Sequence, residues 1–593
     1  MSNFYLDNPD LTFRLEHAGL QRVVRLREDD YSQARDFTFA PKDYEDALDS
    51  FHRTLEIAGD IAGEFVAPRA EDVDRAGSEL SGGEVCYAPG ISESLERLRQ
   101  ADLMGITLPR RYGGLNFPVT VTIMVVEMVS RADPALMNIF GLQDIADTVN
   151  KFASEELKAE LLPRFAGGEV TGSMALTEPE AGSDLQSVQL KATPADDGGW
   201  RLNGVKRFIT NGCGQISLVL ARSEEGTTDA RGLSLFVYVR DEHMKIRRLE
   251  DKLGIHGSPT CELQFTDAPA RLVGERRRGL TMYVMSLMNG ARLGIAAQAQ
   301  GIAEAAFRAA AKYADERVQF GRPINRLTAV AAMLADMKVS ILASRALLYE
   351  TSLIVDMKDA LEHSLERAAQ GGGAAGHDPG VAAAPDRSGA SADEVRELRT
   401  ELKRYTRLAA LYTPLCKACS TEMANRVTYD SLQVHGGSGY MRDFAVERHA
   451  RDARITNIYE GTTQLQVVAA IGGVLGESLA DRLDEYDAWD LSATPELLDR
   501  LRAARALLGE AVTRVKQTGD ERFRDYHARR LVEMGIDVVC GYLLLRDAQQ
   551  DAQRLLAARH FMEGASARVA GGAQLIAAGR PEDLDDLSAL GRV

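Results

Sequence analysis

A glutamate on a tight turn is the strongest candidate for chemistry in this sequence. The segment RDARITNIYEGTTQLQ (451–466) places Glu460 after Tyr459 and ahead of Gly461 and two hydroxyl residues. A glycine-rich turn, VHGGSGY (434–440), lies just upstream. Desolvation on such a turn raises the pKa of a carboxyl group, and a carboxylate in that setting can serve as a general base. We therefore expect Glu460 to accept a proton in a buried site.

A loop upstream of the turn offers hydrogen-bond donors. The segment MALTEPEAGSDL (174–185) is rich in helix breakers and leads into a run of strands. Its backbone N–H groups, with the hydroxyls of Thr177 and Ser183, could bind a ring carbonyl or a pyrophosphate. An ordinary capped loop is the alternative interpretation.

Two other segments combine aromatic, hydroxyl and cationic groups. In RFITNG (207–212), Phe208 could stack on a planar cofactor and Thr210 could hydrogen-bond a ring nitrogen, although a buried hairpin end would look the same. In ERVQFGRPI (316–324), Arg317 is suited to clamp a phosphate bidentately. An arginine at a helix end is also a favourable cap.

The elements that position these residues change type twice along the chain. Near residue 170 a helical pattern gives way to short alternating runs, predicted as strands over 188–193, 200–210, 216–223, 233–240 and 261–268. Helical patterns return after Gly279, with long helices predicted over 291–320, from about Ala329 to Leu361, and over 395–427. Residues 1–45 look irregular. The predicted domains are an N-terminal extension (1–44), a helical domain (45–168), a β domain (169–276), a helical bundle (277–473) with a flexible insertion (369–393), and an extra helical domain (474–593).

Composition limits the class of protein. A chain of 593 residues is too long for one core, and its net charge of −17 argues against binding nucleic acid. Six cysteines lack disulfide spacing, and no Cys or His pair completes Cys416 and Cys419, so we expect a reducing cytoplasm and no metal. Neither a signal peptide nor a membrane-spanning run is visible, and membrane contact is not expected.

Together and in this order, these segments resemble the acyl-CoA dehydrogenase family. TEPEAGSD, RFITNG, the ARLGIAAQAQG…ERVQFGRPI helix, QVHGGSGY and RDARITNIYEGTTQLQ follow the family's order and spacing over about residues 45–470. GIHGSPTC (254–261) and the extension after residue 470 resemble a subgroup with an added C-terminal helical domain. The resemblance implies an α+β multidomain fold, in which an N-terminal α-helical domain, a middle β-barrel-like domain and a C-terminal four-helix bundle precede the extra helical domain.

The resemblance also implies FAD as the cofactor and acyl-CoA as the substrate. Arg317, Gln319 and Phe320 match the helix end that reaches the FAD of a neighbouring subunit. Substrate contacts are implied at Ser183, Asn289, Arg292 and Gly461. All the positions that match FAD contacts are Leu176, Thr177, Ser183, Phe208, Thr210, Arg317, Gln319, Phe320, Gln433, Gly436, Gly437, Thr462 and Gln464.

In the chemistry that the resemblance implies, Glu460 removes the α-proton of the thioester while a hydride passes from the β-carbon to the flavin. The backbone N–H at Glu460 and a ribityl hydroxyl hold the thioester oxygen, and the product is a trans-2-enoyl-CoA. Some relatives carry their base on the helix of Arg292, but Ala291 precedes it here, which leaves Glu460 as the only matched base. Electron-transfer flavoprotein is the implied acceptor.

Two other functions remain open at this stage. An acyl-CoA oxidase would share the fold and the base but let oxygen reach the reduced flavin. A non-catalytic acyl-CoA-binding protein could keep the fold, although the retained Glu460 argues against it. The resemblance implies a homodimer, with a tetramer as the alternative. We expect His256 and His435 to be structural or solvated, and Met282, Met285 and Met288 to be core residues.

Overall fold

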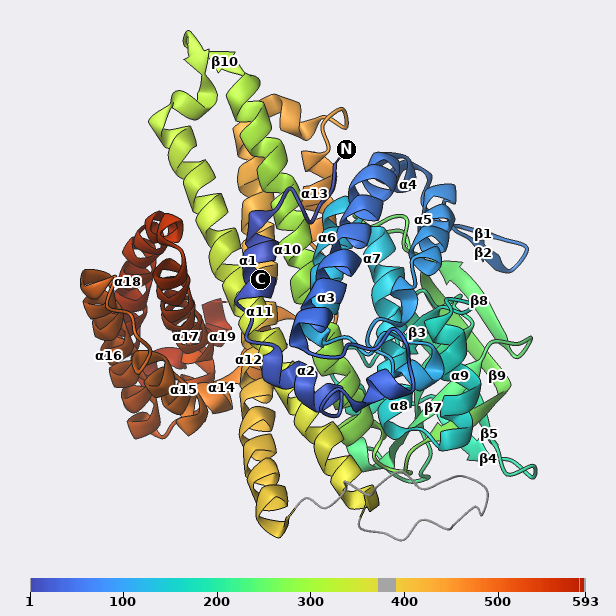
Figure 1. The fold of residues 1–593 in the computed structure, drawn as a ribbon. Coiled ribbons are helices and arrows are strands. Elements are labelled where there is room, and N and C mark those ends of the chain that lie inside the picture. Colours follow the sequence, from blue (N-terminus) through green and yellow to red (C-terminus); the bar gives the residue numbers. More distant parts are fainter. Residues whose placement is uncertain (1, 372–390, 586, 591–593) are drawn as a thin grey trace.

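A long helical bundle divides the molecule, with helices and a β domain on one side and an extra helical domain on the other. The computed structural model describes residues 2–371, 391–585 and 587–590. Figure 1 shows the bundle helices upright at the centre, the N-terminal helices and the strands to the right, and the C-terminal helices to the left. The arrangement confirms the α+β multidomain fold expected from the sequence.

The N-terminal part is helical from the start. Residues expected to be irregular contain two short helices, α1 (Pro9–Glu16) and α2 (Gln21–Arg27). The side chain of Asp43 caps the next helix by accepting a hydrogen bond from the backbone N–H of Asp46 (2.9 Å). The further elements are α3 (Tyr44–Asp60), α4 (Ala70–Ala76), β1 (Glu79–Ser81), β2 (Glu84–Cys86), α5 (Pro89–Gln100), α6 (Val119–Ala132), α7 (Pro134–Phe140), α8 (Ile145–Phe152) and α9 (Glu155–Ala166).

Seven strands form a sheet that curls back on itself. Their order is β3-β6-β4-β5-β9-β7, β8 pairs with β9, and β6 also pairs with β7, which closes the path. The five strands expected from alternation are present, and β3 and β8 are additional. The strands are β3 (Gly172–Ala175), β4 (Lys191–Pro194), β5 (Trp200–Thr210), β6 (Ile216–Arg222), β7 (Leu233–Val239), β8 (Met244–Leu249) and β9 (Thr260–Val273).

Strand β6 is buried on both faces, which explains its continuous apolar sequence. Leu218 and Leu220 belong to the core that also holds Leu161 of α9. Val219 and Ala221 alternate with them and pack inside the sheet. Because successive side chains of a strand point to opposite faces, one strand joins the barrel interior to the N-terminal helices.

Three long helices form the bundle. They are α10 (Met285–Glu316), α11 (Thr328–Gly371) and α12 (Ala392–His435), and α12 begins with a capping box between Ser391 and Glu394. Most of the insertion expected at 369–393 lies outside the described residues. Shorter elements follow: β10 (Val318–Gln319) and β11 (Arg322–Pro323) between α10 and α11, and then α13 (Val446–Ala453), α14 (Thr463–Leu475) and α15 (Glu477–Asp487).

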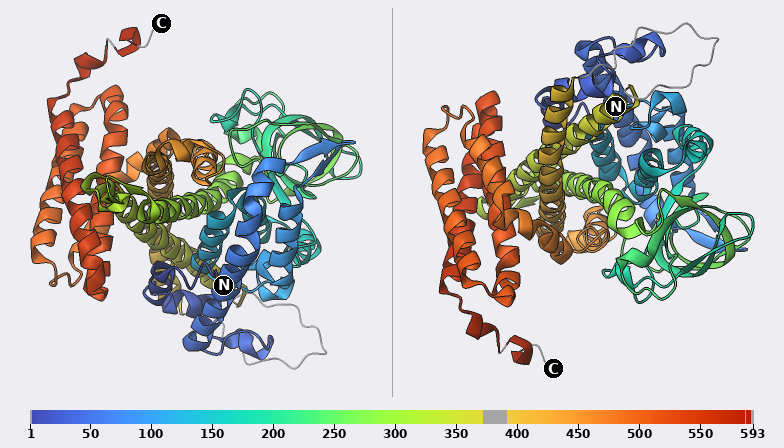
Figure 2. Two further views of the ribbon diagram at one scale, coloured as in Figure 1. Left: turned by 90° about the horizontal axis from the view of Figure 1, so that it is seen from above. Right: turned by 90° about the horizontal axis from the view of Figure 1, so that it is seen from below.

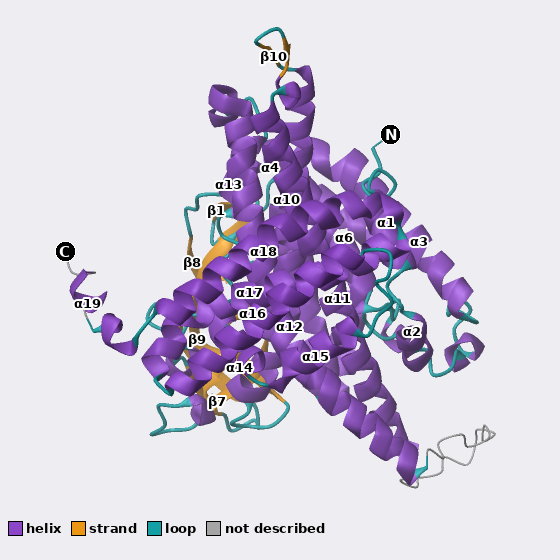
Figure 3. Cartoon of the chain, turned by 90° about the vertical axis from the view of Figure 1, so that its left-hand side faces the viewer, coloured by secondary structure: helices purple, strands orange, loops and turns teal. Residues whose placement is uncertain are grey.

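The extra domain packs against the side of the bundle that lies away from the sheet. Its helices α16 (Pro495–Thr518), α17 (Glu521–Gln550) and α18 (Leu555–Ala578) pack on one another, and α17 also contacts α11 and α14. Figure 2 shows these helices as a separate layer, and Figure 3 shows them in front of the bundle with the strands behind. A short helix, α19 (Leu587–Leu590), follows.

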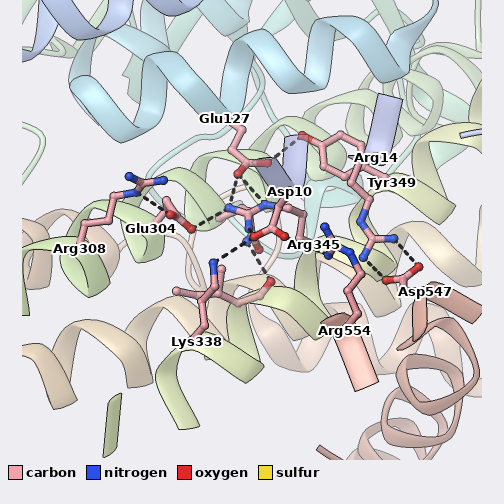
Figure 4. Close-up of polar contacts among 12 residues, drawn as sticks. Asp10, Arg14, Glu127, Glu304, Arg308, Lys338, Arg345, Tyr349, Asp547 and Arg554 are labelled. Atoms are coloured by element: carbon pink, nitrogen blue, oxygen red, sulfur yellow. Dashed lines mark hydrogen bonds and ion pairs between the residues drawn. The ribbon is translucent and has the colours of Figure 1, made fainter. Parts of the chain in front are cut away.

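A buried cluster of charges joins these parts (Figure 4). Arg345 of α11 has no exposed surface and donates hydrogen bonds to Glu127 of α6 (2.7 Å) and Glu304 of α10 (2.9 Å). It also pairs with Asp10 of α1 at 3.3 Å, and Asp10 in turn pairs with Arg554 next to α18 at 2.9 Å. The N-terminal helix, the bundle and the extra domain therefore share one set of ion pairs.

Candidate functional site

A cavity of about 790 Å³ lies between the α7–α8 segment, the start of α10 and the loop between α13 and α14. Apolar side chains supply much of the wall, as is usual for sites that bind small organic molecules. The polar groups on the wall include Asn138, Asp144, Thr210, Asn289 and Glu460. The structure therefore brings three residues chosen from the sequence, Thr210, Asn289 and Glu460, to one cavity.

The loop that carries Glu460 has an unusual backbone. Glu460 has φ +52° and Gly461 has φ +91°, both in the left-handed region. A Cβ on Gly461 would lie 2.6 Å from Nε2 of Gln466, so glycine is required there for space as well as for conformation. Thr462 ends the loop by capping α14, where its hydroxyl accepts a hydrogen bond from the backbone N–H of Leu465 (3.4 Å).

The Glu460 carboxyl group lies where its proton affinity is raised. Burial raises its pKa, while the nearby cations of Lys417 and Arg292 act in the opposite direction. Its side chain is only partly accessible, and it lines the cavity. A carboxylate that is poorly solvated and faces a cavity can accept a proton from a bound molecule.

Tyr459 anchors the same loop to the scaffold. Its hydroxyl donates to Oδ1 of Asn138 on α7 (3.1 Å) and contacts Oε1 of Gln298 on α10. The amide of Gln298 donates to the carbonyl of Pro134 (3.0 Å) and to Oδ1 of Asn138 (2.8 Å). The residue before Glu460 is thus fixed to both α7 and α10.

The β domain supplies part of the wall. Met174 at the end of β3 and Thr210 at the end of β5 both line the cavity. The loop after β3 is held by buried Lys206, whose Nζ donates to the carbonyl of Leu176 (2.8 Å) and to Glu178 (2.9 Å). Burial lowers the pKa of Lys206 to about 8, although Glu178 opposes the shift. This lysine fixes the loop in which Leu176 and Thr177 lie.

Phe208 points away from the core near this wall. Its φ is +60° and about half of its surface (52 %) is exposed, which excludes the buried hairpin end considered from the sequence. Ser183 is also exposed, on the loop after Thr177, and Gly182 has open space around its Cα. These groups are available to a molecule lying along the β domain.

Other candidates lie at the far end of the bundle. The hairpin with Arg317, Gln319 and Phe320 is exposed at the tip by β10 (Figure 1), and Phe320 is 90 % exposed. The glycine turn belongs to the same end, because Tyr313 near the end of α10 stacks on His435 (ring centroids 4.3 Å apart).

None of the candidates at that end lines the cavity of Glu460, and neither does Gln464 on α14. Gln433, Gly436 and Gly437 are exposed, and Gly436 has φ +60° with open space around it. The structure therefore separates the sequence candidates into two places, as a site that is shared between subunits would require.

Several residues of the site were not foreseen. Lys417, on α12, donates hydrogen bonds to the backbone on both sides of Glu460, and Asp144 lines the cavity with a pKa that burial raises to about 7. The expectation that Met282 and Met285 are core residues was wrong, because both are exposed by about two fifths (41 % and 43 %) and line the cavity. The only signal for Lys417 was a charged residue within an apolar helical run, LYTPLCKAC. Within the described residues, no group of three or more His, Cys, Asp or Glu could hold a metal ion.

Comparison with known proteins decides the family. Three models of acyl-CoA dehydrogenase domains match successive parts of the chain: the N-terminal domain over 52–169, the middle domain over 173–268, and the C-terminal domain over 278–381 and 394–471. A further acyl-CoA dehydrogenase C-terminal model matches 476–584. The chain belongs to the acyl-CoA dehydrogenase family. It is an oxidoreductase with the extra C-terminal domain expected from the sequence.

Individual relatives agree with this assignment. The 3-methylmercaptopropionyl-CoA dehydrogenase of Ruegeria pomeroyi is 32 % identical over 72 % of this chain and 70 % of its own length. The butyryl-CoA dehydrogenase structure from Megasphaera elsdenii has a TM-score of 0.58 and 30 % identity over 72 % of this chain and 98 % of that one. An acyl-CoA dehydrogenase from Bacillus anthracis complexed with FAD has a TM-score of 0.72 over 91 % of this chain and 90 % of that one, at 22 % identity, and shares the fold.

Acyl-CoA dehydrogenases depend on FAD, and the residues present fit that cofactor. Phe208, half exposed beside the loop of Leu176, could stack on the flavin ring, and the Thr210 hydroxyl, which lines the same cavity as Glu460, could hydrogen-bond it. No helix within the described part of the chain is long and apolar enough to cross a membrane.

Proposed function

We propose that this acyl-CoA dehydrogenase converts an acyl-CoA thioester to the trans-2-enoyl-CoA, with Glu460 as the base. The observation that carries the proposal is the partly accessible Glu460 carboxyl group, whose pKa burial raises and which lines the same cavity as Thr210 of the β domain. An α-hydrogen beside a thioester is only weakly acidic, so a desolvated and positioned carboxylate suits the task.

The residues of the chain bind and orient the substrate and move its proton. Glu460 takes the α-proton, and its backbone N–H, exposed by the left-handed turn, donates to the thioester oxygen. Arg292 and Asn289, which are joined by a 3.2 Å hydrogen bond, lie at the start of α10 where the CoA chain enters, and Ser183 and Gly461 complete the substrate contacts. FAD, when bound, accepts the hydride from the β-carbon.

The chain holds FAD with two groups of residues in this proposal. Leu176, Thr177, Ser183, Phe208, Thr210, Thr462 and Gln464 belong to the end near Glu460. Arg317, Gln319, Phe320, Gln433, Gly436 and Gly437 belong to the other end of the bundle and contact the FAD of a second subunit. The proposed assembly is a homodimer, the proposed electron acceptor is electron-transfer flavoprotein, and the proposed location is the cytoplasm. Family membership and the separation of the two groups support these statements.

Glu460→Gln tests the role of the base. The amide cannot accept the proton, so we expect anaerobic flavin bleaching by acyl-CoA to slow by about 10³-fold while the bound flavin keeps its spectrum. The matched control is Glu477→Gln, an exposed residue at the start of α15. Near-normal bleaching by the Glu460→Gln enzyme would show that another residue deprotonates the thioester.

A panel of acyl-CoA thioesters of different length and branching, scored by the same bleaching, identifies the preferred acyl group. Slow reoxidation of the reduced enzyme in air is expected of a dehydrogenase. Rapid release of hydrogen peroxide would instead make the enzyme an oxidase.

A further inference from the structure

A buried lysine holds the loop of the proposed base from behind. Lys417 has no exposed surface, and its Nζ donates to the carbonyl of Tyr459 (2.7 Å) and to the carbonyl of Gly461 (2.5 Å). These two carbonyls lie on either side of Glu460 in the chain. One ammonium group on α12 thus holds the peptide unit that joins Tyr459 to Glu460 and the one that joins Gly461 to Thr462, on the two sides of Glu460.

The geometry of Glu460 requires such support. A left-handed backbone is strained in a residue with a Cβ, and it persists only where neighbouring groups hold it. Gln466 gives additional support, since its Nε2 donates to the carbonyl of Gly461 (2.9 Å). Among the described residues, however, only Lys417 bridges the two sides of Glu460 with charge-assisted hydrogen bonds, which are stronger than neutral ones.

Lys417 also contributes to the charge around the base. The ionisable groups that face Glu460 are Lys417 from α12, Arg292 from α10 and Tyr459 from its own loop. Glu422, one turn along α12, faces Lys417. Burial lowers the pKa of Lys417 to about 7, so the ammonium form is present on the acidic side of neutrality, where a carboxylate most needs help to stay ionised.

We propose that Lys417 is the positioning residue of the Glu460 base: it clamps the carbonyls on both sides of that residue, and its positive charge keeps the carboxylate ready to accept a proton. The proposal rests on the proposed function, because it assumes that Glu460 is the base. It predicts a second contribution that a lysine serving the fold alone would lack, namely control of the ionisation of Glu460.

Three substitutions of Lys417 distinguish the effect of its two hydrogen bonds from the effect of its positive charge. Lys417→Met removes both, Lys417→Gln keeps N–H donors but loses the charge, and Lys417→Arg keeps both. The matched control is Lys403→Met, since Lys403 is an exposed lysine on the same helix. Flavin content and the thermal midpoint of each variant show that it has folded.

The first measurement is the rate of anaerobic flavin bleaching against pH. We expect Lys417→Met to lower the rate about 10²-fold, because a displacement of about 1 Å in a catalytic group costs that much. The acid limb of the profile should move up by about one pH unit in the Met and Gln variants, because a nearby cation has been lost. Lys417→Arg should restore the position of the limb, and Lys403→Met should match the parent enzyme.

The second measurement needs no substrate. Hydrogen exchange of the backbone amides over residues 459–462 should quicken about tenfold in Lys417→Met and stay unchanged in Lys403→Met, because the clamp no longer restrains local opening. An acid limb that does not move in folded Met and Gln variants, or unchanged exchange in the Met variant, would overturn the proposal. Failure of the parent enzyme to bleach with any acyl-CoA would instead refute the proposed function, and with it the assumption about Glu460.

Discussion

Two buried glutamates of this protein, each close to cations, have pKa values that are shifted in opposite directions. Around Arg345, burial alone would raise the pKa of Glu304, but Arg345, Lys338 and Arg308 outweigh it and hold that pKa well below the ordinary value. At Glu460, burial prevails over Lys417 and Arg292, and the pKa is raised. Carboxylates that are bonded directly to cations lose proton affinity and hold the fold together, whereas Glu460 keeps the proton affinity that the proposed reaction needs.

The geometry explains the difference. Arg345 donates directly to Glu127 and Glu304, so each charge is compensated by hydrogen bonds. Lys417 donates its hydrogen bonds to two backbone carbonyls and acts on Glu460 only at longer range. The cation therefore moderates the proton affinity of Glu460 without abolishing it.

The largest effect is expected when the Arg345 cluster is broken. Arg345→Met leaves Glu127, Glu304 and Asp10 without their shared partner, and breaking a buried ion pair costs about 3–5 kcal/mol. We expect a large fall in the denaturation midpoint, with the bleaching rate per bound flavin largely kept. Arg396→Met, on the exposed face of α12, is the control. An unchanged midpoint for Arg345→Met would refute the view that this cluster holds the fold together.

An intermediate effect is expected at the anchor of the base loop. Tyr459→Phe removes a hydroxyl that bonds Asn138 and Gln298. It leaves the buried Oε1 of Gln298 unpaired at a cost of about 1–3 kcal/mol, whereas Oδ1 of Asn138 keeps its hydrogen bond from the Gln298 amide. The bleaching rate should fall by about tenfold, because the orientation of the base is loosened. Tyr429→Phe, at an exposed position on α12, should change neither quantity. Full activity of Tyr459→Phe would mean that Lys417 and Gln466 suffice to hold the loop.

The smallest effect is a pH dependence of stability that differs in sign between the two regions. The raised pKa of Glu460 contributes stability below its unfolded value, near 4.5, and that contribution is lost as the pH rises through the folded pKa. The lowered pKa values of Asp10 and Glu304 contribute stability above their unfolded values, which is lost as the pH falls through the folded ones. Thermal melts of Glu460→Gln should therefore show a slightly higher midpoint than the parent at neutral pH and no gain near pH 4. A gain that persists in acid would contradict the raised pKa.

The sequence predicted the fold class because its periodicities are strong. The alternation in LSLFVYVR and the alanine-rich pattern after Gly279 are local signals of a strand and of a helix, and the structure has both. Helix α1 was not predicted, because the order of this short segment depends on contacts made by Asp10 and Arg14 with residues hundreds of positions away. Tertiary contacts of that kind do not produce a hydrophobic periodicity in the sequence.

In the candidate site too, some residues could be predicted from the sequence and others could not. Glu460 and Thr210 lie in recognisable motifs, and both line the cavity. The sequence does not predict the role of Lys417, because nothing in the pattern of one helix indicates which loop a buried ammonium group will contact. Met282 and Met285 were assigned to the core because helical spacing alone does not distinguish a core face from a cavity wall.

The contacts of Asp10 affect which truncated forms of the chain would remain stable. A fragment trimmed to the region of the three shared family domains, which begins near residue 52 and ends near residue 471, would lack Asp10 as well as Arg554 and Asp547. Arg345 would keep Glu127 and Glu304 but lose one of its three carboxylate partners. Solubility and expression should suffer most in fragments that lack one end and retain the other. The retained end then carries charges whose partners were on the missing end, as Arg554 and Asp547 do without Asp10 and Arg14.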